Sequence, residues 1–136
     1  MFTNQKSRID KVVQNCLSEI RPEVEPYLDA DFKSRQGIMN DAYIVGYLEG
    51  WSRELIAKFG IKGCHDQTGA LMGVYAHLIG GNRQSVSERL LSLYKEHSNT
   101  EFQSGRQDGT DRVHGTSIGR QDEVAYLLKH RLAAIS

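Results

Sequence analysis

The chain of 136 residues is 39% hydrophobic and 25% charged, a composition typical of one globular domain rather than of a disordered segment. Its 17 basic side chains balance its 17 acidic ones, so no surplus of positive charge favours binding to nucleic-acid phosphates. The two cysteines form no CxxC pair, and no apolar run approaches the ~20 residues that span a bilayer. We therefore expect a single cytoplasmic domain over residues 1–136, without a membrane segment, metal or cofactor.

The first predicted helix runs from about residue 4 to residue 20. Its apolar side chains follow the i, i+3, i+4, i+7 spacing of one helical face: Ile9, Val12, Val13, Cys16, Leu17 and Ile20. Pro22 and Pro26 each lack a backbone donor and clash with the preceding turn, which predicts that the helix ends before them. We expect a short helix within residues 23–31 and a connection over residues 32–40.

Two helices at the centre of the sequence, over residues 41–59 and 66–80, carry the strongest pattern. Each has a face of large apolar side chains and an opposite face of small residues spaced four apart: Gly46 and Gly50, then Gly69 and Gly73. A glycine inside a helix costs about 1 kcal/mol relative to alanine, so two on one face indicate a neighbour that packs too closely for a side chain. We predict a central, close-packed antiparallel pair of these helices, or a homodimer seam along the same stripe.

Two further helices are predicted over residues 82–96 and 120–134, on the spacing of their leucines and valines. Between them, residues 97–119 lose all apolar periodicity and are rich in Gly, Gln, Ser, Asp and Arg, which predicts a long polar loop. No segment shows the alternation of a β-strand. The predicted fold class is therefore all-α, a bundle of five to six helices.

The long loop is the first candidate binding surface. The tetrad Gly-Arg-Gln-Asp occurs twice, at residues 105–108 and 119–122, and long loops in small domains commonly carry function. The charged side chains that we expect to bind a partner protein are Arg106, Asp108, Asp111, Arg112, His114 and Arg120. A packed loop without a ligand is the alternative.

A helix-turn-helix over residues 72–91 is the basis of an alternative, DNA-binding function. Ala76, Gly80 and Val86 have the spacing of its first helix, its turn and its second helix. The second helix would present polar side chains to base edges: Asn82, Arg83, Gln84 and Ser85. Arg89 stands where a core aliphatic residue is expected, which counts against this interpretation.

A third interpretation is a small enzyme or ligand-binding domain. Cys64, His65 and Asp66 stand at the predicted start of a helix, where the helix dipole favours a thiolate, and residues 105–122 would complete the site. None of the five histidines pairs with another at i, i+4, so no metal site is predicted. Because no set of nucleophile, base and orienting group is recognisable, we expect a non-enzymatic interaction protein that binds another macromolecule, preferably a protein, as a homodimer.

Overall fold

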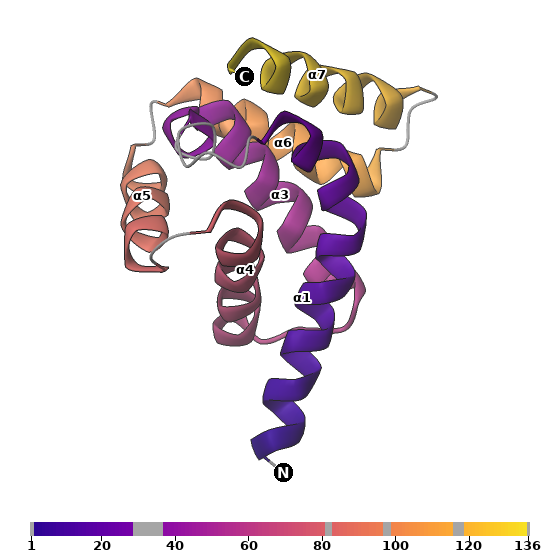
Figure 1. Cartoon of the computed structure of the whole chain (residues 1–136), viewed down its shortest axis with the longest axis vertical. Coiled ribbons are helices and arrows are strands. Elements are labelled where there is room, and N and C mark those ends of the chain that lie inside the picture. The colour runs from indigo at the N-terminus through magenta and orange to yellow at the C-terminus, as the bar shows by residue number, and fades with distance from the viewer. Residues whose placement is uncertain (1, 29–36, 81–82, 97–98, 116–118, 136) are drawn as a thin grey trace.

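The computed structural model describes residues 2–28, 37–80, 83–96, 99–115 and 119–135, without the side chains of residues 2–5 and 83. Within these ranges the chain forms α-helices and one short 3-10 helix and contains no strand, which confirms the predicted all-α class. The elements are α1 (Phe2–Val24), the 3-10 helix η1 (Glu25–Tyr27), α3 (Ala42–Lys58), α4 (Cys64–Ile79), α5 (Arg83–Lys95), α6 (Thr100–His114) and α7 (Arg120–Ile135) (Figure 1).

The first helix is longer than the sequence predicts, because α1 continues through Pro22 to Val24. A proline inside a helix costs about 3 kcal/mol, but Ile20 and Val24, on either side of it, are completely buried. Burying two such side chains contributes about 3–6 kcal/mol, which offsets that cost. Pro26 stands at the start of η1, where its missing donor would have had no helical partner. Most of the remaining predicted segment up to residue 40 lies outside the described residues.

The predicted loop over residues 97–119 is wrong, because Thr100–His114 form the helix α6. Asn99 caps its start, where the side-chain oxygen accepts the backbone N–H of Phe102 at 3.1 Å. The buried positions of α6 are Phe102, Gly105, Asp108 and Gly109. Since two glycines and an aspartate make up most of its buried face, hydrophobic periodicity does not reveal this helix.

Helices α3 and α6 are in backbone contact, in the part of the fold that α7 covers (Figure 1). A β-carbon added at Gly46 would lie 2.3 Å from the carbonyl oxygen of Phe102, and one at Gly105 would lie 2.1 Å from that of Tyr43. The same clash recurs at Gly50, at 2.2 Å, one turn further along both helices. The contacts advance in the same direction on both helices, so the pair is parallel. A close-packed helix pair is present, but its second helix and its direction differ from the prediction.

Helix α4 does not pair its glycines with those of α3. A β-carbon at Gly73 would lie 3.0 Å from a methyl group of Val13, so this face of α4 packs on α1. A β-carbon at Gly69 would have no atom within 4 Å. The large-residue face of α4 contacts α3 instead, since the buried Tyr75 hydroxyl donates to the carbonyl oxygen of Val45 at 2.7 Å. The predicted antiparallel glycine contact between these two helices is therefore wrong.

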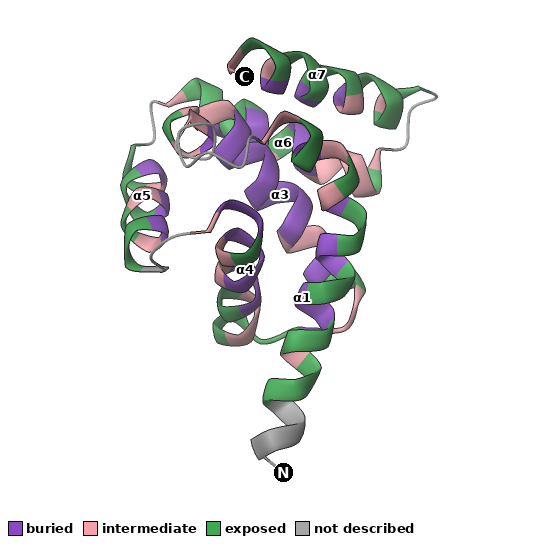
Figure 2. Ribbon diagram, viewed as in Figure 1, coloured by how far each residue is buried: buried purple, intermediate pink, exposed green. Residues whose placement is uncertain are grey.

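The core is centred on α3. Figure 2 shows α3 buried along most of its length, whereas α5 and α7 each expose one side. Helix α7 inserts Val124, Leu128 and Leu132 into the core, while Leu127, which the apolar spacing also places in that stripe, is 37% exposed. In the described parts of the chain, no helix is both long and apolar enough to cross a membrane.

Candidate functional site

The contact between α3 and α6 is built from a repeated sequence motif. In α3 the motif is Tyr43-x2-Gly46-x2-Glu49-Gly50-x2-Arg53, and 59 positions later α6 has Phe102-x2-Gly105-x2-Asp108-Gly109-x2-Arg112. The first glycine of each copy contacts the carbonyl oxygen of the aromatic residue that opens the other copy. The pair therefore has an approximate internal two-fold axis along the helices, with one acidic side chain on each side of it.

Glu49 is completely buried between two arginines. Its Oε1 accepts a hydrogen bond from Nε of Arg53 at 2.6 Å, and its Oε2 accepts one from Nε of Arg106 at 2.6 Å. A buried carboxylate is tolerated when it is paired in this way. The Arg106 guanidinium also lies over the ring of Tyr94, 5.4 Å from its centroid. Burial, followed by the charge of Glu49, raises the pKa of the Tyr94 hydroxyl.

Asp108, the equivalent residue in α6, has a different set of partners. The Tyr43 hydroxyl donates to its Oδ2 at 2.6 Å, and Arg120 of α7 donates to its Oδ1 at 2.8 Å. Arg120 also donates to the Asp111 carboxylate at 3.0 Å. Burial, together with the hydrogen bond to Asp108, raises the pKa of Tyr43 well above its usual range, so this hydroxyl remains a donor throughout the physiological pH range.

The other predicted partner-binding residues also make contacts inside the chain. Arg112 pairs with Glu23 of α1 and lies over the Trp51 ring, 4.8 Å from its centroid. His114 Nε2 lies 2.6 Å from a carboxylate oxygen of Glu54. The six predicted residues thus lie on α6 and at the start of α7, where they connect α6 to α1, α3 and α7. Their binding to a partner stays a prediction.

The predicted helix-turn-helix corresponds to α4 and α5, and residues 81–82 between them lie outside the described residues. Asn82 and the side chain of Arg83 lie outside the described residues, whereas Gln84 and Ser85 are exposed at the start of α5. Arg89 donates to a backbone carbonyl oxygen ahead of α3 at 2.9 Å and so joins two segments of the chain. The described side chains of α5 form no basic face. DNA binding stays a prediction without structural support.

The turn at Cys64–Asp66 begins α4, with Gly63 at the cap and Asp66 in the first turn. Cys64 and His65 are exposed. Asp66 borders a cleft of about 360 Å³ that is shared with Arg8 and residues 60–63. No group of three His, Cys, Asp or Glu side chains in the described residues is placed to hold a metal ion. An enzymatic or ligand-binding role for this turn stays a prediction.

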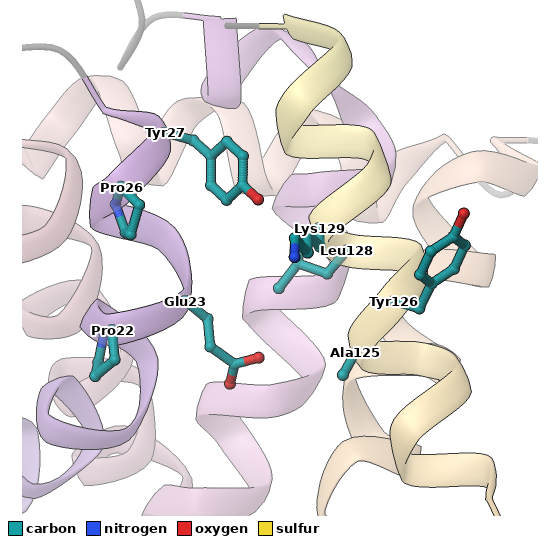
Figure 3. A pocket seen from close by; sticks show the side chains of 8 residues that line it. All are labelled: Pro22, Glu23, Pro26, Tyr27, Ala125, Tyr126, Leu128 and Lys129. Atoms are coloured by element: carbon teal, nitrogen blue, oxygen red, sulfur yellow. The ribbon is translucent and has the colours of Figure 1, made fainter.

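An open apolar groove separates the end of α1, with η1, from α7 (Figure 3). Its volume is about 560 Å³, and its lining is Pro22, Glu23, Pro26 and Tyr27 on one wall and Ala125, Tyr126, Leu128 and Lys129 on the other. Tyr126 is 65% exposed and stacks on His130, with 6.1 Å between the ring centroids. Sequence patterns do not predict the groove, because its two walls are far apart in the chain. The one sequence signal for the groove is Tyr126, an aromatic residue that lies outside the apolar stripe of α7.

Comparison of the chain with protein-family models, with curated proteins and with solved structures finds no match. The groove and the two buried carboxylates are therefore interpreted from their own geometry. The carboxylates are satisfied by partners within the chain, whereas the groove leaves apolar side chains uncovered, which makes the groove the candidate functional site.

Proposed function

We propose that this chain is a non-enzymatic helical interaction domain that binds an apolar segment of a partner protein in the groove between α1–η1 and α7. The observation that carries the proposal is the exposure of apolar side chains at this groove. Tyr126 on one wall is 65% exposed, and Pro22 and Pro26 on the other wall are exposed as well. Uncovered apolar surface around a recess is typical of binding sites.

The walls of the groove favour an amphipathic helix as the bound segment. Both walls are helical, so most of their backbone N–H and C=O groups are already used within the helices, and Pro22 and Pro26 have no N–H to offer. An extended strand would find no backbone partners here. A helix satisfies its own backbone and binds through its apolar side chains, which the proline and tyrosine rings of the groove can accommodate.

The charges at the rim favour a helix that also carries a carboxylate. Glu23 is neutralised by its ion pair with Arg112. Lys129, on the opposite wall, is exposed, and among the described residues it has no ion-pair partner. A carboxylate beside the apolar anchors of the partner would meet this unopposed positive charge, a contact that contributes up to about 1 kcal/mol at an exposed site.

Selection from a displayed library of amphipathic helical peptides tests this proposal. The wild-type protein should enrich acidic, apolar helices. The variant Ala125→Arg places a long cation against the apolar wall and should weaken their binding about tenfold or more, and Lys129→Glu should disfavour the acidic members. Leu91→Arg, at a 53% exposed position of α5, is the matched control and should bind as the wild type does. Equal binding by Ala125→Arg and wild type, or no enrichment at all, would refute the proposal.

A second copy of the chain is the alternative occupant of the groove. The glycines of α3 contact α6, so a homodimer would not use them, whereas the uncovered apolar side chains of the groove could form its seam. Light scattering separates the two cases. A dimer that Ala125→Arg dissociates would identify the second copy, rather than a foreign helix, as the occupant.

A further inference from the structure

The side of the α3–α6 pair that holds Glu49 carries more positive than negative charge. Among the described residues, Glu49 is the carboxylate that pairs with both Arg53 and Arg106, and neither arginine has another acidic partner. On the opposite side of the pair, Arg120 faces Asp108 and a second aspartate of α6. The two copies of the motif therefore differ in charge, and an excess of one positive charge remains at Glu49.

The two arginines that bind Glu49 have N–H donors that make no hydrogen bond within the described residues. Each uses its Nε for the bond to Glu49, and Arg53 also donates from Nη2 to the Tyr94 hydroxyl at 3.3 Å. No partner for the Nη atoms of Arg106 is found in the described residues, and the side chains of Arg53 and Arg106 are 32% and 36% exposed. Because both Nε atoms bind one carboxylate, the two guanidinium groups are neighbours, and about a third of each arginine side chain is accessible to solvent.

We propose that Arg53 and Arg106 form a binding site for a phosphate group, separate from the groove. A guanidinium group binds phosphate through parallel N–H···O bonds. The several oxygens of a tetrahedral phosphate can accept parallel pairs of bonds from both guanidinium groups at once, whereas the two oxygens of a carboxylate are enough for only one such pair. Glu49 already binds both arginines, and the Tyr94 ring also contacts Arg106, so phosphate binding costs little additional side-chain entropy.

Thermal unfolding in the presence of inorganic phosphate, with the ionic strength held constant by chloride, tests the site. At ten times the Kd the Tm of the wild type should rise by about 5 °C. The control is Arg131→Gln, which removes an arginine of equal 36% exposure that pairs with two carboxylates, and it should keep this rise.

The variant Arg106→Gln should lose the rise in Tm. Since it leaves Glu49 with one partner, circular dichroism must show that it folds. Arg106→Lys, which keeps the charge without the planar fork, is the second variant and should bind phosphate at least fivefold more weakly. No rise in the wild type, or an undiminished rise in both variants, would overturn the site. An equal rise with acetate would overturn the assignment to phosphate.

Discussion

Replacing Gly105 by alanine tests the parallel contact between α3 and α6 most directly. The added methyl carbon would lie 2.1 Å from the carbonyl oxygen of Tyr43 and 2.9 Å from the backbone nitrogen of Tyr47, so the helices must separate by about 1 Å to restore ordinary contact. Overpacking of this kind costs about 3–4 kcal/mol when it acts on two rigid backbones. Alanine regains about 1 kcal/mol of helix propensity, which leaves a net destabilisation of about 2–3 kcal/mol.

That destabilisation corresponds to a fall in Tm of about 7–10 °C for a chain of this length, measured by circular dichroism and checked by urea unfolding. Because Gly46 and Gly105 are related by the internal two-fold axis, the Tm of Gly46→Ala should fall by a similar amount. Gly69→Ala is the matched control, because its β-carbon would meet nothing within 4 Å on an exposed helix face, and it should stabilise the protein by about 0.5–1 kcal/mol. A Gly105→Ala protein that melts at or above the wild-type temperature would refute the backbone contact.

Four further outcomes follow from the buried polar and thiol groups. Glu49→Ala should lower the free energy of unfolding by about 2–3 kcal/mol in urea titrations, because two partly buried arginines lose their shared acceptor. Tyr43→Phe should cost about 1–2 kcal/mol, since a buried carboxylate loses a donor at 2.6 Å, while Tyr126→Phe should be neutral. Burial, then the charge of a nearby glutamate, raises the pKa of the Cys16 thiol to about 12, so Ellman's reagent at pH 8 should modify Cys64 alone until the protein is unfolded. The Cys16 thiol should also make stability fall as the pH rises above about 8.5, where the unfolded thiol ionises.

Hydrophobic spacing predicts those helices that bury large aliphatic side chains. It places α3, α4, α5 and α7 close to their observed bounds, because each has valines, leucines or isoleucines at helical intervals. It fails for α6, where burial is achieved by backbone contact at Gly105 and Gly109 and by ion pairs of Asp108 and Arg106. A polar helix that packs through glycine resembles a loop in composition.

The repeat of the α3 motif in α6 was available in the sequence as a signal for this helix. Five pairs of positions separated by 59 residues hold two aromatic, four glycine, two acidic and two arginine residues in matching order, and the apolar spacing of α3 already predicts that copy of the motif as a helix. The groove is harder to predict, because Pro22 and Tyr126 approach one another only through the packing of α1 and α7. The position of α7 depends in turn on Arg120, which reaches α6, and on Tyr47, which donates to the Val124 carbonyl oxygen at 2.8 Å.

The parallel direction of α3 and α6 also bears on how the chain folds. Parallel neighbours cannot be joined by a short turn, so α4 and α5 must first carry the chain back to the end at which α3 began. The glycine contacts then close loops of about 59 residues, and the entropy of closing such loops slows folding relative to a simple up-and-down bundle. Because α6 has so few apolar side chains, its helical conformation is expected to be unstable until it packs against α3. Its formation is therefore expected late in folding, after α1, α3 and α4 have assembled the surface on which it packs.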